Sequence, residues 1–440
     1  MNNKEIPNGW ALSKLKDITQ IISGGTPARD IQNFWEGGTI KWVTPTDITN
    51  SSSRILMSTK DQITKEGFNN CSAKLLPPGT LLMTSRATLG EIKVAGKEMC
   101  TNQGFKSLVP SKHIDNWFLY YQMILNKERY ASFGIGSTFL EVNTKDTEKF
   151  DILHPPLHEQ RKIAKILTTV DNLIEKTETL IAKYQSIKQG MMHDLFTRGV
   201  YANGQLRPPV DEAPELYKES ELGWIPREWE TGSIINYVDT NDKNSIKPGP
   251  FGSSLKKECY TEKGYKIYGQ EQVIKGDSTF GDYYISKEKY FELFSFRVKP
   301  NDVLISLVGT VGKVLILPHD CDDGIINPRL IKISPDLRKN CPIFLAHLLM
   351  SEIISIQLEK LSHGLTMEVL SATTLRKVCF PIPVFEEQNR ISNVINAINL
   401  MILKEQTILN KYRKTKQALM QDLLTGKVRV NPDKPEDTPS

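Results

Sequence analysis

The chain has 440 residues, 39% of them hydrophobic and 24% charged, which is typical of a soluble globular protein with about two to four domains. Its formal net charge of +5 permits binding to nucleic acid without establishing it, and no apolar run approaches the ~18 residues of a membrane-spanning helix. The six cysteines are scattered without a C-x-x-C pair, which predicts reduced thiols in a cytoplasm rather than disulfides or a zinc site.

Residues 1–152 are predicted to form a globular domain. Apolar and β-branched runs, such as 77–94, are bounded by glycine and proline, which is typical of short strands. The apolar segment IDNWFLYYQMIL at 114–125 is predicted to be one of a few helices. The domain is therefore expected to mix α and β structure.

A long helix is predicted within residues 153–200, entered from prolines that keep the preceding chain extended. Apolar side chains recur there at alternating steps of three and four residues, interrupted by Thr177: Ile163, Ile166, Val170, Leu173, Leu180, Tyr184, Ile187 and Met191. This heptad pattern predicts a helix that buries one narrow seam against another helix. About forty residues would give a helix roughly 60 Å long. Residues 201–224 are polar and proline-rich without periodicity, and are predicted to be a linker.

The second half of the chain repeats this order. Residues 225–380 are predicted to form a second globular domain and residues 381–430 a second long helix, followed by a flexible tail, 431–440. The two helices align without a gap at an offset of 228 residues, as Gln160 and Gln388 show (388 − 160 = 228), so that Met401 corresponds to Leu173. The domain openings match more faintly, as IPNGW at 6–10 and IPREW at 225–229. Similar helices carrying two different domains suit a protein that presents two recognition surfaces at a fixed separation.

Several stretches together resemble a known family. They are the two IP-x-x-W openings, GGTP-x-R at 24–29, GPFGSSLK at 249–256, the proline-to-Glu-Gln junctions at 155–160 and 383–388, and the linker from 206 to 229. In this order, over nearly the whole chain, they look like the DNA-specificity (S) subunit of type I restriction-modification systems. No single one of these motifs is specific by itself.

The resemblance implies a fold, a function and partners. The fold is α+β: two mixed α/β target recognition domains separated by two long antiparallel helices, a pseudo-twofold tandem repeat with a coiled-coil spacer. Each domain would read one half of an asymmetric bipartite site in double-stranded DNA. Each helix region would dock one methyltransferase (M) subunit, which binds S-adenosylmethionine and methylates adenine N6. Restriction/translocase (R) subunits would complete the enzyme, and this chain would hold no cofactor itself.

DNA contacts require Lys or Arg for phosphates and Arg, Asn or Gln for base edges. In the first domain we predict them at Arg29, Lys41, Arg54, Arg86, Asn102 and Gln103, and in the second at Lys256, Lys257, Gln270, Lys313, Asn327 and Arg329. The alternative for each cation is a solvated surface charge. For Asn102 and Asn327 the alternative is a turn in which the side chain caps backbone groups.

The junctions between domain and helix are predicted to dock the methyltransferase subunits, through Glu159, Gln160, Arg161, Glu387, Gln388 and Arg390. A structural role is also open for the Glu-Gln pairs, because their side chains suit the free N–H groups of a first helical turn. Both roles can hold.

No catalytic constellation emerges from the sequence, so the chain is predicted to be a non-enzymatic subunit. GTVGK at 309–313 resembles a phosphate loop, but Leu307 and Val314 replace its first glycine and its Ser or Thr. His154, His158 and His193 lack the partners of a metal site. Two other functions remain open: a coiled-coil scaffold that grips proteins, and a specificity chain for another type of restriction-modification enzyme.

Overall fold

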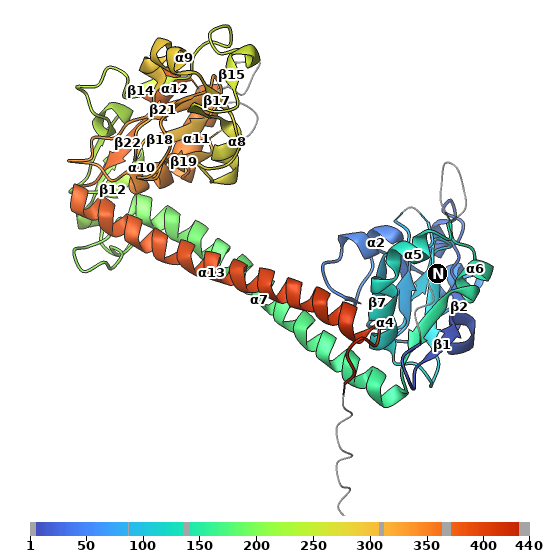
Figure 1. Ribbon diagram of the computed structural model, residues 1–440. Helices are drawn as coiled ribbons and strands as arrows, with labels where there is room; N and C mark the ends of the chain where they lie inside the picture. Colours follow the sequence, from blue (N-terminus) through green and yellow to red (C-terminus); the bar gives the residue numbers. More distant parts are fainter. Residues whose placement is uncertain (1–5, 87, 135–140, 308–311, 363–370, 431–440) are drawn as a thin grey trace, which may run out of the picture. The chain divides into compact units, whose positions relative to one another are not determined.

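The computed structural model describes residues 6–86, 88–134, 141–307, 312–362 and 371–430 (Figure 1). The predicted tail, 431–440, and most of the GTVGK stretch lie outside these residues. The chain divides into two compact units: unit 1 combines residues 1–179 with 406–440, and unit 2 comprises 180–405. The domain boundaries predicted from the sequence stay a prediction.

Two long helices, α7 (Leu157–Thr197) and α13 (Phe385–Leu423), each contribute to both units. Within unit 1, Asp171 and Glu178 of α7 pair with Lys416 and Arg413 of α13, each at 2.7 Å. The residue numbers rise along one helix as they fall along the other. The helices therefore run antiparallel, which confirms the predicted arrangement.

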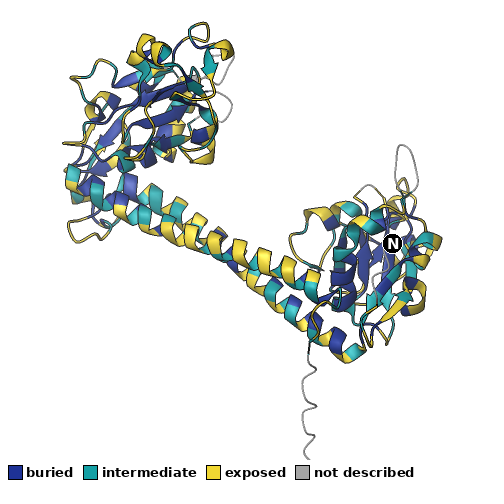
Figure 2. Cartoon of the chain, viewed as in Figure 1, coloured by how far each residue is buried: buried dark blue, intermediate teal, exposed yellow. Residues whose placement is uncertain are grey.

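The predicted heptad seam is partly wrong. Leu173, Ile187 and Met401 are 38%, 41% and 51% exposed, whereas Thr177 and Ile181 are buried. A straight helix drifts by about 20° per heptad, so residues spaced by seven rotate away from the partner helix. Thr177 tolerates burial because its hydroxyl donates to the carbonyl of Leu173 at 2.8 Å. Exposed apolar positions therefore remain on the long helices, and Figure 2 shows exposed residues along both of them.

The globular part of unit 1 is built on a five-stranded and a three-stranded sheet, in the orders β2-β9-β6-β7-β4 and β5-β3-β8, with β1 and β10 paired beside them. The strands are β1 (Ala11–Lys14), β2 (Thr19–Ser23), β3 (Ile40–Val43), β4 (Ile55–Leu56), β5 (Asp61–Ile63), β6 (Leu81–Met83), β7 (Ile92–Ala95), β8 (Cys100–Thr101), β9 (Lys106–Pro110) and β10 (Asp151–His154). The helices are α1 (Leu15–Ile18), η1 (Gln32–Phe34), α2 (Pro45–Asn50), α3 (Lys65–Asn69), α4 (Asn116–Leu125), α5 (Lys127–Ala131) and α6 (Thr144–Lys149).

The globular part of unit 2 contains two four-stranded sheets, in the orders β14-β21-β18-β19 and β15-β17-β16-β20, with the pairs β11–β12 and β13–β22. The strands are β11 (Tyr217–Ser220), β12 (Gly223–Pro226), β13 (Glu230–Gly232), β14 (Ile246–Pro248), β15 (Tyr260–Thr261), β16 (Tyr265–Tyr268), β17 (Tyr284–Ile285), β18 (Val303–Ser306), β19 (Val314–Ile316), β20 (Gly324–Ile326), β21 (Leu330–Ile333) and β22 (Phe380–Ile382). The helices are η2 (Pro214–Leu216), η3 (Ile234–Tyr237), η4 (Lys257–Cys259), α8 (Gln270–Lys275), α9 (Lys287–Glu292), η5 (Phe294–Phe296), α10 (Pro342–Leu349), α11 (Glu352–Ser362) and α12 (Ala372–Lys377).

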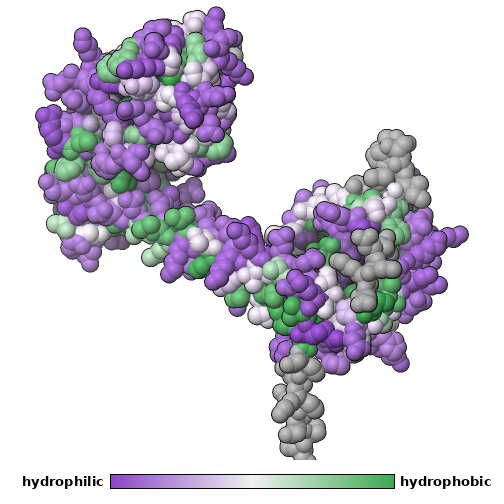
Figure 3. All heavy atoms as spheres, viewed as in Figure 1, coloured by the Kyte–Doolittle hydropathy of each residue, from purple (hydrophilic) through white to green (hydrophobic). Residues whose placement is uncertain are grey.

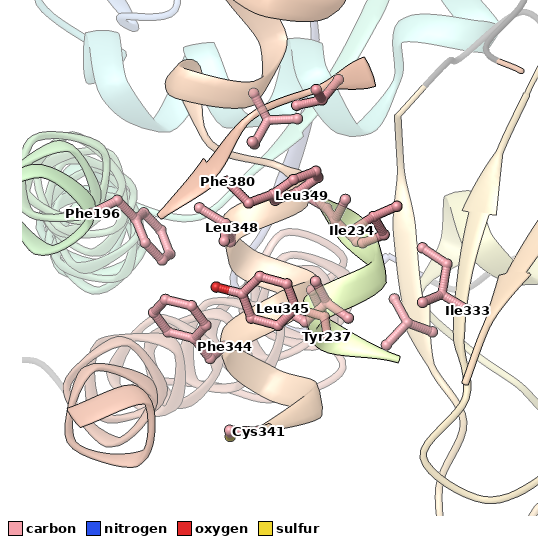
Figure 4. Packing of buried hydrophobic residues seen from close by; sticks show 14 of the residues in the cluster. Phe196, Ile234, Tyr237, Ile333, Cys341, Phe344, Leu345, Leu348, Leu349 and Phe380 are labelled. Atoms are coloured by element: carbon pink, nitrogen blue, oxygen red, sulfur yellow. The ribbon is translucent and has the colours of Figure 1, made fainter. Parts of the chain in front are cut away.

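The main core of unit 2 packs the sheet β14-β21-β18-β19 together with α10 and the end of α7. Phe196 of α7 meets Phe344 of α10 edge-on, at 5.4 Å between ring centroids, and Tyr237 stacks on the same phenylalanine (Figure 4). All three side chains are almost completely buried. Such aromatic burial is among the largest single contributions to a core, so this end of α7 is anchored to its domain.

The segment predicted to be a linker, 201–224, is folded onto unit 2. It forms β11, which pairs antiparallel with β12, and its Arg207 and Tyr217 are only 4% and 2% exposed. The sequence predicts a linker here from its polar, proline-rich composition without periodicity, and such a pattern does not reveal that these two side chains are buried.

Within the described residues, no single helix has the length and apolar character to cross a membrane. Among the helices of that part of the chain, one pair, α10 with α11, meets the criterion of length and composition when taken together, and this pair is bent by 53°.

Candidate nucleic-acid interface

A turn built on Asn102 follows β8 in unit 1. The backbone N–H of Asn102 donates to the carbonyl of Val43 at 3.0 Å, and its side-chain Oδ1 accepts from the N–H of Gly104 at 2.9 Å. A Cβ added at Gly24 would overlap the carbonyl oxygens of Thr101 and Asn102, so only glycine lets this loop lie directly on the turn. Asn102 is therefore a residue that shapes the turn.

Unit 2 repeats this turn after β20 with different neighbours. Asn327 donates its N–H to the carbonyl of Tyr268 at 2.8 Å, and its Oδ1 accepts from the N–H of Arg329 at 2.9 Å. A Cβ at Gly249 would again overlap the carbonyl oxygen of the asparagine. The asparagines and the glycines are each 225 residues apart (327 − 102 and 249 − 24). Both domains thus build one frame, a glycine loop resting on an asparagine turn.

A short helix begins beside each asparagine turn. The N–H of Thr44, which precedes α2, donates to Asp47 at 2.7 Å, and the N–H of Gly269, which precedes α8, donates to Gln272 at 2.9 Å. The half-buried Gln270 lies in the first turn of α8. Three chain segments, the glycine loop, the asparagine turn and a helix start, therefore converge in each domain.

The side chains that this frame exposes differ between the domains. In unit 1 the exposed Gln103 follows Asn102 and accepts a hydrogen bond from the Thr26 hydroxyl. In unit 2 the exposed Arg329 stands two residues after Asn327. At the offset of 225, Pro328 corresponds to Gln103, and Arg329 to Gly104. The frame thus exposes an amide in one domain and, one position further along, a guanidinium in the other, and these groups read different base edges.

The predicted cations of unit 1 are mostly engaged with nearby acids. Arg29 pairs with Asp61 at 2.8 Å and lies 3.7 Å from the ring centroid of Trp35, although its side chain is 56% exposed. Arg86 is also exposed and pairs with Glu141 at 2.9 Å. Lys41 lies half-buried in β3. These exposed ion pairs are weak, so a phosphate can compete for the two arginines.

Among the described residues, the predicted cations of unit 2 form fewer ion pairs than those of unit 1. Lys256, Lys257, Lys313 and Arg329 are exposed, and within the described ranges none of their side chains forms an ion pair. They are therefore available for phosphate contacts.

The prediction for Arg54 has to be corrected. Its guanidinium is 13% exposed and reaches α7, where it bonds Glu175 at 2.8 Å, Asp171 at 3.3 Å and Asn172 at 2.6 Å. It also donates to the hydroxyl of Tyr121 at 3.2 Å. Although burial alone would lower the pKa of Arg54, these acceptors raise it. Arg54 therefore ties the loop before β4 to the long helix, and its environment argues against a DNA contact.

The glutamines of the two junctions have structural roles. Gln160 and Gln388 are each 1% exposed. Gln160 accepts at 2.8 Å from the N–H of Asp115, the residue that caps α4, and Gln388 accepts at 3.0 Å from the N–H of Cys341, which caps α10. Each glutamine thus binds the N-terminus of a neighbouring helix. The sequence had suggested instead that it binds the free N–H groups in the first turn of its own helix.

The glutamates of the junctions bind arginines that follow the other long helix. In unit 1, Glu159 is 3% exposed and binds Arg429 through both carboxylate oxygens. In unit 2, Glu387 is 2% exposed and binds Arg207 at 2.5 Å. The indole N–H of Trp229 also donates to Glu387 at 2.9 Å.

Burial therefore corrects the docking prediction for both Glu-Gln pairs, because these four side chains are used inside the chain. Of the other two predicted docking residues, Arg161 is exposed, and Arg390 is half-buried with a buried Nε that lacks a hydrogen-bond partner in the described part of the chain.

Sequence reasoning missed Arg207, Arg429 and Trp229, which complete these clusters. A signal was present. The IP-x-x-W openings place a tryptophan at both domain starts, and each long helix is followed by a glycine and an arginine.

The repeated geometry agrees with comparisons to known proteins. Residues 7–185 and 229–411 match the family model described as "Type I restriction modification DNA specificity domain". The chain belongs to this family. Two copies of the family's domain account for the repeated turns and junctions.

Two relatives from Methanocaldococcus jannaschii illustrate the similarity. The type I restriction enzyme MjaVIII specificity subunit is 26% identical over 437 residues, covering 98% of this chain and 95% of the relative. The MjaIX specificity subunit is 35% identical over 226 residues, half of each chain. The crystal structure of a type I restriction-modification S subunit from M. genitalium shares the fold, with a TM-score of 0.58 at 15% identity over 96% of this chain and 97% of that one.

Proposed function

We propose that this chain is the DNA-specificity subunit of a type I restriction-modification enzyme, in which each globular domain reads one half of an asymmetric bipartite DNA site. The observation that carries the proposal is the asparagine turn, built twice on one frame and presenting different side chains. A shared frame with different exposed groups gives two related domains different sequence preferences.

The proposed base contacts are Gln103 in the first domain and Gln270 and Arg329 in the second. Asn102 and Asn327 would position the loops rather than read bases. The proposed phosphate contacts are Arg29, Lys41, Arg86, Lys256, Lys257 and Lys313. Phosphate contacts supply affinity without sequence preference, whereas amide and guanidinium groups discriminate between base edges.

The proposed partners follow from the family. We propose that the helices α7 and α13 set the spacer between the half-sites and that their regions dock two methyltransferase subunits, joined by restriction/translocase subunits. S-adenosylmethionine would bind to the methyltransferases, so this chain would be non-catalytic and work in the cytoplasm. A protein-gripping coiled-coil scaffold fits less well, because it gives no role to the paired loop frames.

Modification-sensitive sequencing tests the proposal in cells with and without the gene. A bipartite N6-methyladenine motif should disappear on deletion and return on complementation. If every methylated motif persists in a cell that expresses the methyltransferase, the proposal fails. A neighbouring gene for a combined restriction-and-modification enzyme would instead assign the chain to another type of system.

Domain exchange gives a finer test. Replacing residues 225–378 with the corresponding part of another specificity subunit should change one half of the motif and leave the other unchanged. A change in both halves would contradict separate reading by the two domains.

A further inference from the structure

The two units differ at one equivalent place, where a helix of the globular part, α4 or α10, lies beside the long helices α7 and α13. In unit 1 this place holds an ionic cluster. The hydroxyl of Tyr121, in α4, donates to Asp171 at 2.6 Å, and Lys416 of α13 pairs with the same carboxylate at 2.7 Å. Together with Arg54 and Glu175, each charge in this cluster has a partner of opposite sign.

The corresponding cluster in unit 2 has lost its acids. The helix offset of 228 places Lys188 at the position of Lys416, and Asn399 and Leu403 at those of Asp171 and Glu175. His347 replaces Tyr121, because each lies six residues after the cap of its helix, Asp115 in α4 and Cys341 in α10. The lysine is kept while both carboxylates are absent.

Two polar groups at this place in unit 2, the Nδ1 of His347 and the ammonium of Lys188, lack a partner of the kind found in unit 1 among the described residues. The Nδ1 of His347 is buried and accepts or donates no hydrogen bond in the described ranges, and the side chain is 9% exposed. Lys188 is half-buried and has no ion pair among those residues. Burial lowers the pKa of both groups, and the charge of Lys188 lowers that of His347 further. A half-buried ammonium without a counter-charge is destabilising, so a carboxylate supplied from outside would be stabilised here.

Lys188 opens into a hollow that has room for such a group. The hollow, about 490 Å³, lies between α7 and the α10–α11 segment and is wholly within unit 2. Its lining includes Lys188, His193, Met192, Phe196, Met350 and Ile353. The face of unit 2 that Figure 3 displays carries hydrophobic patches on a mostly hydrophilic surface.

The lining favours a protein side chain over a DNA phosphate. Phosphate sites on DNA-binding surfaces gather several cations, whereas this hollow combines one lysine with apolar side chains and with the neutral polar side chains of Gln185, Gln189 and Ser355. Its rim also carries the exposed Glu352, whose carboxylate lies 3.8 Å from His193.

We propose that the hollow beside Lys188 docks a methyltransferase partner through an acidic side chain flanked by apolar residues, which pairs with Lys188 in place of the missing carboxylates. This inference rests on the proposed function. Unit 1, where Asp171 already neutralises Lys416, would not bind a partner in this way.

Binding to the methyltransferase subunit of the same system, measured by titration calorimetry and native mass spectrometry, tests the proposal. Lys188→Met should weaken one partner site by roughly tenfold or more, because a charge-assisted contact is lost. Asn399→Asp, which restores the carboxylate found in unit 1, should also weaken that site while raising the thermal stability. The matched control Lys183→Met, an exposed lysine on the same helix, should bind like the unaltered chain.

Carbodiimide coupling, which joins an amine directly to a carboxylate, identifies the group that meets Lys188. A cross-link from Lys188 to an Asp or Glu of the methyltransferase supports the proposal. The proposal is overturned by a cross-link that reaches only Glu352, or by unchanged partner affinity in both Lys188→Met and Asn399→Asp. It is also overturned if Lys188→Met changes the affinity for DNA in the absence of the methyltransferase. If the unaltered chain binds no methyltransferase at all, the proposed function itself fails. If the unaltered chain binds the methyltransferase and both variants bind it equally well, only the inference about Lys188 fails.

Discussion

Glu159, at the start of α7, accepts hydrogen bonds from Nε and Nη2 of Arg429, at 2.8 and 2.7 Å, although 270 residues separate the two side chains. Arg429 lies beyond the end of α13, so the last described part of the chain completes the first unit. In unit 2, Arg207 follows α7 and binds Glu387 at the start of α13. The first turn of each long helix is therefore bound by an arginine from the segment that follows the other long helix.

The ion pairs Arg207–Glu387 and Arg429–Glu159 should contribute differently to the free energy of unfolding. Arg207 and Glu387 are both almost fully buried, so Arg207→Ala leaves an uncompensated buried carboxylate and should destabilise unit 2 by about 3–5 kcal/mol. Arg429 is 45% exposed, so water can replace it and Arg429→Ala should have a smaller effect, confined to unit 1. Hydrogen exchange of each unit, followed by mass spectrometry, measures both effects. Equal loss of protection in the two variants would contradict this difference.

Arg54 should matter for stability and not for DNA recognition. Arg54→Ala removes the partner of two α7 carboxylates and should destabilise unit 1 by about 3 kcal/mol. The methylated motif should stay the same as long as the chain folds. Denaturant unfolding and motif sequencing of the same variant provide the measurement, with the exposed Arg86→Ala as the comparison. An altered motif in Arg54→Ala, at normal stability, would restore Arg54 as a DNA contact.

His347 should make unit 2 less stable in mild acid. Burial lowers its folded-state pKa to about 4, below its ordinary value near 6.5, so the unfolded chain binds more protons between these values. The stabilising contribution is therefore complete above about pH 6.5 and falls as the pH drops toward 4, by up to about 3 kcal/mol.

Urea unfolding at pH 7 and pH 5 measures this loss. His347→Gln, which does not titrate, should lose less stability than the unaltered chain over the same interval. A pH dependence that is identical in the two proteins would show that other groups cause it.

Arg329 and Lys313 should affect DNA binding in different ways. Arg329→Ala should weaken binding by about 1–3 kcal/mol and relax one position in one half-site, because a guanidinium reads base edges. Lys313→Ala should weaken binding to all sequences and lower the salt dependence by about one charge. Binding of the assembled methyltransferase complex to variant sites at several salt concentrations distinguishes the two. A sequence-independent loss in Arg329→Ala would reassign it to a phosphate.

Some features could be predicted from particular residues. The helix starts followed from the repeated prolines and Glu-Gln pairs, and the antiparallel pairing expected for them is confirmed by Asp171 and Lys416. The heptad pattern failed at Leu173 and Ile187, because the period of a straight helix is slightly longer than that of the pattern. Burial of Glu159 and Glu387 was not predictable, since their arginine partners lie far away in the sequence.

The sequence by itself determined that the chain is duplicated and that each copy ends in a long helix, because these properties depend on local periodicity and order. The order of its motifs also resembles the family to which the chain belongs. Only the tertiary structure decided which polar side chains face solvent. It turned Arg54 and the junction glutamates into internal contacts and left Lys188 without an ion pair among the described residues, because the environment of a charge depends on which distant segments pack beside it.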